Sequence, residues 1–226
     1  MIVTTDELAP GPADTSHLAA VLADAAAGRF PAADGRATFL SQVSARDAGV
    51  LSFTGHAVVF ADVDPAWLAA QLPAGDYAAP LSVVFLHALG ARLGRAAGSI
   101  DLLACASSLA GPPPVRLGDE SGQAHPRIQR ALRYRDDVRA WQAEGGVVLL
   151  GRGVAGRWEV AIEVDPDCRE RGLGRQLATA ARHLVPAGET LWAQIAPGNA
   201  ASVRAFLAAG FVPVGAEVLF SPHGVD

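Results

Sequence analysis

The spacing of hydrophobic residues changes in a regular way along the C-terminal half of the chain. Short apolar runs bounded by Gly-containing turns predict strands, and apolar residues three and four positions apart predict helices. The predicted elements, in chain order, are strands at 138–142, 147–151 and 158–164, a helix at 172–185, a strand at 191–196, a helix at 199–209 and a strand at 211–220. This order predicts an α/β (α+β) fold in which helices pack on a mixed sheet.

The N-terminal half has a weaker pattern. After a polar, Pro-rich leader at 6–14, an Ala-rich helix is expected near 16–27. The other expected elements are a strand at 56–61, a short helix from Pro65, a helix at 81–93 and a strand at 99–106. Residues 127–134 are compatible with either a helix or a strand.

Three successive prolines after Gly111 begin a polar, Gly-rich stretch that extends to Pro126. Proline can continue neither a helix nor a central strand, so we expect a boundary or an excursion loop there. The chain is accordingly divided into an N-terminal leader and helix (1–50), an N-terminal α/β region (51–126) and a C-terminal core (127–226).

The region 51–126 is either the front of one extended domain or a degenerate second copy of the core. The second alternative comes from a short repeat, because residues 63–65 and 164–166 both read Val-Asp-Pro and each is followed by a helix and a strand. Three matching residues are weak support for a duplication, and no Gly-rich loop follows Pro65. The single extended domain is the favoured interpretation.

Bulk composition limits the class of protein. Of the 226 residues, 50% are hydrophobic and 18% are charged, as in soluble globular proteins with a substantial core. The net charge of −5 disfavours nucleic acid as a partner, and no apolar stretch has the length of a signal core or a membrane span. The two cysteines and six histidines lack metal-ligand spacing. We therefore expect a cytoplasmic protein with reduced thiols and no membrane partner.

A Gly-rich turn at 169–174, Arg-Glu-Arg-Gly-Leu-Gly, connects the strand predicted at 158–164 directly to a helix. The first N–H groups of a helix lack internal partners and lie at the positive end of its dipole, so they attract anions. The two glycines leave space for a phosphate, and each arginine can add a charge-assisted hydrogen bond worth about 1.5–3 kcal/mol. Taken alone, the turn is equally well explained as a tight turn with two solvated arginines.

A second motif begins at Asn199, which suits a helix N-cap. Ser202 lies one turn further, and Gly210 stands where glycine commonly ends a helix. By itself this pattern indicates only a capped helix.

Together, the two motifs resemble the hallmarks of the GNAT superfamily of N-acyltransferases. The first is similar to the acetyl-CoA pyrophosphate loop of that superfamily and reads Arg169-x-x-Gly172-x-Gly174. The second follows in the expected order and reads Asn199-x-x-Ser202-x-x-x-Phe206-x-x-x-Gly210-Phe211. The resemblance covers about residues 137–220 and implies a mostly antiparallel sheet flanked by helices, with an extended N-terminal region and with acetyl-CoA as cosubstrate.

The resemblance also implies which residues bind the donor. Backbone groups of Ile162 and Val164 would hold the pantetheine arm, and an N–H of this strand would polarise the thioester carbonyl. Asn199 and Ser202 would contact the pantetheine or the nearby strand end. The pyrophosphate would lie on the backbone of Arg169, Glu170, Arg171, Gly172, Leu173, Gly174 and Arg175.

The implied reaction is direct attack of a primary amine on the thioester in a ternary complex, the amine belonging to a small molecule or a peptide N-terminus. Glu159 and Glu163 are the candidate bases, and the alternation of a strand puts them on one face; an ion-pair or surface role is the alternative. Phe206 replaces a family tyrosine and cannot donate a proton. The second hypothesis is therefore a non-catalytic CoA-binding or protein-interaction module; a homodimer is compatible with either.

Five arginines near the start of the core could meet the 3′-phosphate of CoA: Arg127, Arg130, Arg133, Arg135 and Arg139. All 18 basic residues of the chain are arginines, however, so a solvated face is the favoured interpretation. Cys168, beside the Gly-rich turn, is expected to be unreactive.

Overall fold

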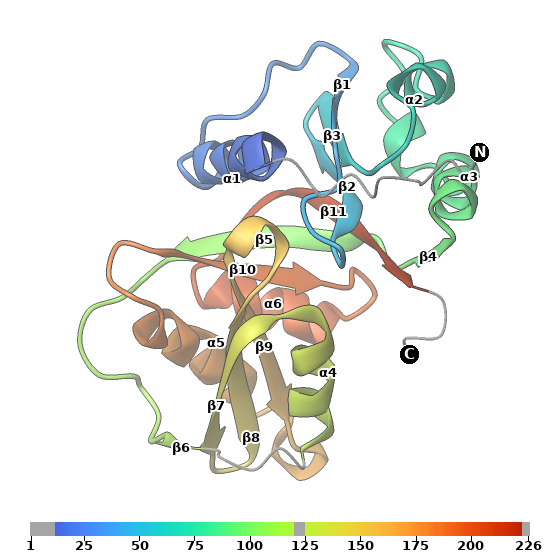
Figure 1. Cartoon of the computed structure of the whole chain (residues 1–226). Helices are drawn as coiled ribbons and strands as arrows, with labels where there is room; N and C mark the ends of the chain where they lie inside the picture. Colours follow the sequence, from blue (N-terminus) through green and yellow to red (C-terminus); the bar gives the residue numbers. More distant parts are fainter. Residues whose placement is uncertain (1–11, 120–124, 223–226) are drawn as a thin grey trace.

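The computed structural model describes residues 12–119 and 125–222 (Figure 1). Their strands form one 11-stranded sheet. The strand order is β1-β3-β2-β11-β5-β10-β9-β8-β7-β6, and β4 pairs with β11 outside this path. The strands are β1 (Arg36–Leu40), β2 (Ala48–Phe53), β3 (His56–Phe60), β4 (Arg95–Ala97), β5 (Asp101–Ser107), β6 (Gly118–Asp119), β7 (Asp136–Ala143), β8 (Gly146–Arg152), β9 (Trp158–Val164), β10 (Thr190–Ile195) and β11 (Val212–Pro222).

Two neighbouring pairs, β1–β3 and β9–β10, are parallel, and the other pairs are antiparallel. The predicted mixed, mostly antiparallel sheet is therefore confirmed. Most of the leader expected at 6–14 lies outside the described residues.

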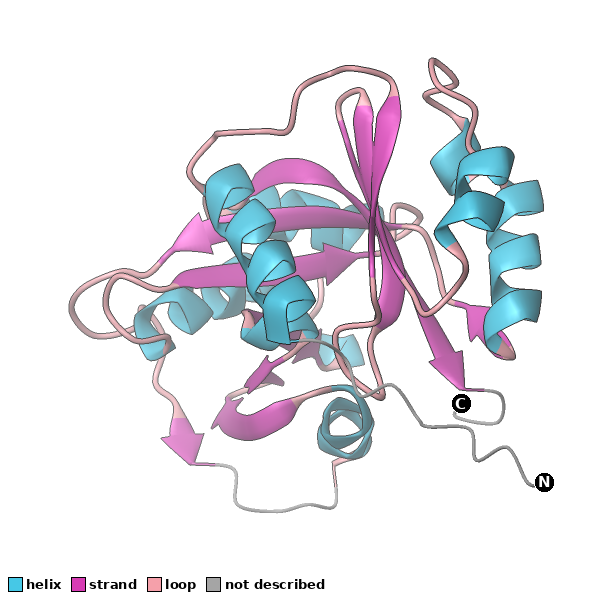
Figure 2. Ribbon diagram, turned by 45° about the horizontal axis from the view of Figure 1, so that its top comes forward, coloured by secondary structure: helices cyan, strands magenta, loops and turns pink. Residues whose placement is uncertain are grey.

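Helices cover both faces of the sheet (Figure 2). They are α1 (Pro12–Ala26), α2 (Pro65–Gln71), α3 (Val83–Leu93), α4 (Pro126–Tyr134), α5 (Leu173–Leu184) and α6 (Ala200–Ala208), with short 3₁₀ helices η1 (Ala79–Leu81), η2 (Val154–Gly156) and η3 (Pro166–Cys168). In β8, Val148 packs in one core cluster with Leu177 of α5, whereas its neighbour Val147 packs with Ile128 of α4. Because successive strand residues point to opposite faces, α4 and α5 lie on opposite sides of the sheet.

The elements predicted for the C-terminal core are present with ends that differ by at most two residues. The ambiguous segment 127–134 is helical because its start has helix-favouring chemistry. The His125 ring accepts a hydrogen bond from the Arg127 N–H at 3.1 Å, and Pro126 occupies the first turn, where its missing N–H is not needed.

Two strands of the N-terminal third, β1 and β2, were not predicted. Gly49 interrupts the apolar pattern of β2, but the fold requires glycine there. A Cβ at this position would lie 2.6 Å from the Val218 carbonyl oxygen and 2.5 Å from the Phe60 ring. The reason for this glycine is a contact with residues far away in sequence, which a local pattern does not reveal.

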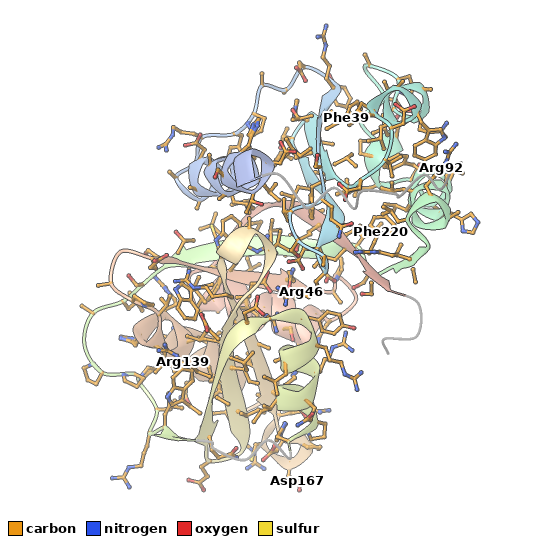
Figure 3. All side chains as sticks on the ribbon, viewed as in Figure 1. Phe39, Arg46, Arg92, Arg139, Asp167 and Phe220 are labelled. Atoms are coloured by element: carbon orange, nitrogen blue, oxygen red, sulfur yellow. The ribbon has the colours of Figure 1, made fainter. Side chains whose placement is uncertain are left out.

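Strands from both halves of the chain alternate in the centre of the sheet. β5 lies between β11 and β10, and β2 is hydrogen-bonded to the other edge of β11. Arg46 lies at the junction of the two halves (Figure 3). It forms an ion pair with Asp136 at 3.2 Å, and its carbonyl accepts a hydrogen bond from Arg95. The domain boundaries at residues 50 and 126 stay predictions, but they separate segments that share one sheet.

Candidate functional site

β9 and β10 diverge shortly after they begin. They pair only at Trp158 with Leu191 and at Glu159 with Trp192. Beyond these positions β9 remains paired with β8 as far as Val164, and β10 remains paired with β5 as far as Ile195. From residue 160 onward, one edge of β9 therefore has no neighbouring strand within residues 12–119 and 125–222.

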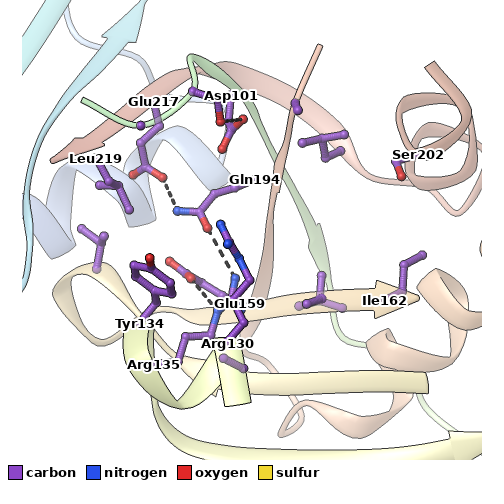
Figure 4. A pocket seen from close by; sticks show the side chains of 18 of the residues that line it. Asp101, Arg130, Tyr134, Arg135, Glu159, Ile162, Gln194, Ser202, Glu217 and Leu219 are labelled. Atoms are coloured by element: carbon purple, nitrogen blue, oxygen red, sulfur yellow. Dashed lines mark hydrogen bonds and ion pairs between the residues drawn. The ribbon is translucent and has the colours of Figure 1, made fainter. Parts of the chain in front are cut away.

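A cleft of about 380 Å³ opens at this divergence. Residues of helix α4 and of the start of α6 line it (Figure 4). The polar and apolar residues that line the cleft include Asp101, Arg127, Arg130, Arg135, Glu159, Ile162, Gln194, Asn199, Ser202, Phe206 and Glu217.

The open edge of β9 carries two carbonyl groups that accept hydrogen bonds from arginines. The Ile162 oxygen accepts from Arg127 Nη2 at 2.8 Å, and the Val164 oxygen accepts from Arg169 Nε at 3.3 Å. The backbone groups predicted to bind the acyl donor thus lie at the strand edge, and two arginine side chains of the protein already form hydrogen bonds with their carbonyl oxygens. A carbonyl oxygen has two lone pairs, so each can accept a second hydrogen bond.

The start of helix α5 is open. Gly172 is its N-cap, with φ 81° in the left-handed region that favours glycine, and within the described residues no side chain caps the helix. A Cβ built on Gly172 meets no atom within 4 Å. Glu170 also has a positive φ of 62°, and both arginines of the turn are exposed. The first amides of α5 are accordingly available to an anion.

Gly174 has a different role from Gly172. A Cβ at Gly174 would lie 3.5 Å from the Ala205 Cβ in α6 and 3.7 Å from Val164 Cγ2. The second glycine of the turn therefore faces the packing of α5 against α6 and β9, rather than the space in front of the helix.

The second motif forms the predicted cap. The Asn199 side-chain oxygen accepts a hydrogen bond from the Ser202 N–H at 3.1 Å. Phe206 is buried, and its ring meets that of Phe211 edge to face with centroids 4.9 Å apart. All three cleft-lining residues of the motif are spaced three or four positions apart along one side of α6, but Phe206 offers only a hydrocarbon surface.

The two candidate bases are in different environments. Glu163 is 43% exposed and forms an ion pair with Arg127 at 3.2 Å. Glu159 is buried, and its two carboxylate oxygens accept hydrogen bonds from Arg157 at 2.9 Å and Arg135 at 2.8 Å. Burial raises the pKa of the Glu159 carboxyl, but the charges of Arg157 and Arg135 outweigh this effect and hold that pKa below its ordinary value.

A buried polar network continues from Glu159 across the sheet. Arg157 Nη2 donates to Glu217 Oε2 at 2.6 Å, and the Gln194 amide donates to the same oxygen (Figure 4). Burial lowers the pKa of Arg157, but Glu217 and Glu159 raise it by more, so that the guanidinium stays charged. Arg157, Gln194 and Glu217 were not among the predicted site residues. The available signal was that the last two are single polar residues within apolar strands.

The five arginines predicted near the start of the core fall into two groups. Arg127, Arg130 and Arg135 line the cleft, whereas Arg133 and Arg139 are exposed elsewhere on α4 and β7.

Both cysteine thiols are free, and burial raises the pKa of Cys105 to about 11. Among the described residues there is no cluster of His, Cys, Asp and Glu suited to a metal ion, and no helix has the length and apolarity needed to cross a bilayer.

The fold and the cleft define an α/β protein with a diverging parallel strand pair and an uncapped helix beside it. Residues 160–218, which run from β9 through both motifs into β11, match the family model described as FR47-like protein. The resemblance to the GNAT superfamily is confirmed for this segment. No curated protein matches the sequence.

Several solved structures are similar to the chain. A GCN5-related N-acetyltransferase from Kribbella flavida is 19% identical, with 62% of this chain and 64% of that chain covered and a TM-score of 0.39. An acetyltransferase from the GNAT family from Colwellia psychrerythraea is 14% identical, with 60% of each chain covered and a TM-score of 0.39. A tandem GNAT protein from the clavulanic acid biosynthesis pathway is 15% identical, with coverages of 59% and 57% and a TM-score of 0.36. The chain spans less than two thirds of the length of each of these structures.

Proposed function

We propose that the protein is an N-acyltransferase that moves an acetyl group from acetyl-CoA to a primary amine in a ternary complex. The observation that carries the proposal is the open edge of β9, which leads directly to the uncapped start of α5. A strand edge binds an extended amide chain, and a helix start binds an anion. Acyl-CoA has these two parts in this order.

In the proposed complex, the amides that begin at Gly172 bind the pyrophosphate, and Arg171 contributes positive charge from the turn. The pantetheine amides pair with the backbone of Ile162 and Val164. To reach these carbonyls they must share them with Arg127 and Arg169 or displace the two side chains. Asn199 and Ser202 border the arm where it enters the cleft.

The reaction forms one C–N bond and breaks one C–S bond. The thioester carbonyl lies along β9, where a backbone N–H stabilises the oxyanion of the tetrahedral intermediate. The attacking nitrogen loses a proton to a base, and the departing thiolate gains one. Phe206 supplies no proton, so in this proposal water protonates the thiolate. Glu159 already has both oxygens hydrogen-bonded to arginines and acts mainly as a fixed negative charge.

Thiol release tests this function. Purified protein with acetyl-CoA and a panel of primary amines should release free CoA thiol only when a suitable amine is present, and mass spectrometry should find the acetylated amine. CoA alone should raise Tm.

The second candidate is a CoA-binding module without turnover, which the hydrocarbon surface of Phe206 favours. A CoA-dependent rise in Tm without thiol release from any amine would support the module. The absence of any CoA-dependent rise would contradict both.

A further inference from the structure

Two carboxylates on neighbouring strands line the cleft on the side away from Ser202 (Figure 4). Asp101 of β5 and Glu217 of β11 are direct partners in the antiparallel register, so their side chains leave the sheet on the same face. Both line the cleft, and Figure 4 shows both side chains beside Gln194. Neither residue belongs to the motifs that resemble the GNAT superfamily.

One carboxylate oxygen of Glu217 has no hydrogen-bond partner among the described residues. Its side chain is only 1% exposed, and Oε2 accepts from both Arg157 and Gln194. Its other oxygen, Oε1, is buried and has no hydrogen-bond partner within the described part of the chain. A buried carboxylate oxygen without a donor is costly, because it has lost water and gained nothing in return. This oxygen can still accept a hydrogen bond from water or from a ligand that enters the cleft.

Asp101 is the more accessible of the pair. Its Oδ1 accepts a hydrogen bond from the Ser99 hydroxyl at 2.7 Å, and Arg130 approaches it from α4. Burial raises the pKa of Asp101 by more than Ser99 and Arg130 lower it. A carboxylate in this state accepts a proton more readily than a surface aspartate does.

We propose that Asp101 and Glu217 form the acceptor subsite and bind the ammonium group of a cationic primary amine, with Asp101 taking the proton. The inference rests on the proposed function and adds the substrate class and the base. The ammonium donates to Glu217 Oε1 and to Asp101, and Asp101 takes one of its protons, which frees the nitrogen lone pair for attack on the thioester carbon. The C–S bond then breaks, and the second proton of the nitrogen passes through water to the departing thiolate.

The contrast with Glu159 supports this choice of base. Glu159 has both oxygens bound by arginines, so no oxygen is directed at a substrate. Among the described residues, the Ser99 hydroxyl donates to Asp101, and Asp101 is the register partner of Glu217 on the same face of the sheet. Two carboxylates that line one cleft suit a group with three N–H donors, such as an alkylammonium.

Binding of a simple amine tests the site without any turnover. Protein with bound CoA is titrated with n-butylamine and with its uncharged analogue n-butanol, and Tm and calorimetric Kd are measured. Butylamine should stabilise the parent clearly more than butanol. Asp101→Asn should weaken butylamine binding at least tenfold. The matched control Asp24→Asn, at a 55% exposed aspartate on α1, should leave it unchanged. Equal responses to amine and alcohol in the parent, or an unchanged butylamine Kd in Asp101→Asn, would overturn the proposal.

Kinetics separate this site from the donor site. In Asp101→Asn the KM for the amine should rise at least tenfold, kcat should fall and lose its dependence on pH in the acidic range, and the KM for acetyl-CoA should not change. Asp101→Glu should restore part of kcat. Glu217→Gln should raise the KM for the amine, with Glu189→Gln, 46% exposed, as its control. A rise in the KM for acetyl-CoA alone would contradict the subsite. If CoA fails to bind the parent, the proposed function fails, and butylamine binding to the protein without CoA still decides whether Asp101 and Glu217 form an amine site.

Discussion

The chain contains two hairpins that end in Val-Asp-Pro and lead into helices, and they differ in one respect that bears on function. β3 is paired over its whole length with β1 on one edge and β2 on the other. The Asp64 carboxylate then caps α2 by accepting from the Ala66 N–H at 2.9 Å. In the described part of the chain, β9 has a full partner only in β8, and no side chain caps α5 after its N-cap residue Gly172.

The Val-Asp-Pro sequence has different surroundings at the two positions. At α2, the aspartate carboxylate accepts a hydrogen bond from a free amide of the helix start, and β1 and β2 cover both edges of the preceding strand β3. After β9, seven residues separate Asp165 from α5, so that the same aspartate does not reach the helix start. The divergence of β10 leaves the edge of β9 open, and the longer connection through η3 and the Gly-rich turn leaves the α5 amides open.

The largest effect is expected from the buried ions of β9, which β3 lacks. Glu159→Gln leaves Arg135 and Arg157 without their shared carboxylate and should lower the free energy of unfolding at pH 7 by about 3 kcal/mol. Because the folded-state pKa of Glu159 is depressed, its contribution is complete above the unfolded value of about 4.3 and is lost as pH falls through the folded value.

Chemical denaturation between pH 3 and pH 7 measures this effect, and the difference between parent and variant should shrink in acid. Glu163→Gln is the control, because Glu163 lies on the same strand and is partly exposed. Equal losses of stability in the two variants would mean that the buried network has no special importance.

The next largest effect concerns the open helix start. Gly172→Glu puts a carboxylate in front of the α5 amides and should weaken CoA binding about 100-fold, or about 2.7 kcal/mol. Gly188→Glu is a close control, since Gly188 has the same φ of 81° and open space around it. Calorimetric titration with CoA measures both. If the two variants bind CoA equally well, the pyrophosphate does not lie at this helix.

A smaller effect is expected at the open strand edge. Arg127→Ala frees the Ile162 carbonyl for the pantetheine and should tighten CoA binding by about three- to tenfold, the loss of one competing hydrogen bond. Arg133→Ala, on the exposed face of the same helix, should leave the Kd unchanged. Weaker CoA binding in Arg127→Ala would instead assign this arginine to donor binding.

The smallest effect distinguishes the two Val-Asp-Pro turns themselves. Asp64→Ala removes the cap of α2 and should cost about 1 kcal/mol of unfolding free energy. Asp165→Ala removes no cap hydrogen bond and should cost less than about 0.5 kcal/mol. Urea denaturation of the two variants gives the answer, and the reverse order would contradict the assignment of Asp64 as the cap.

The sequence by itself determined the local features of the C-terminal core. Its elements, the Asn199 cap and the Gly172 turn follow from periodicity and from backbone preferences within a few residues. Tertiary structure alone decided the rest, because contacts between distant strands carry no local signature. Three features arise because β2, β5, β9 and β11 belong to one sheet: the burial of Glu159 between Arg135 and Arg157, the glycine required at position 49, and the pairing of the Asp101 and Glu217 positions. Burial and charge pairing then lower the pKa of Glu159, and burial raises the pKa of Asp101; the spacing of these residues in the sequence leaves both shifts open.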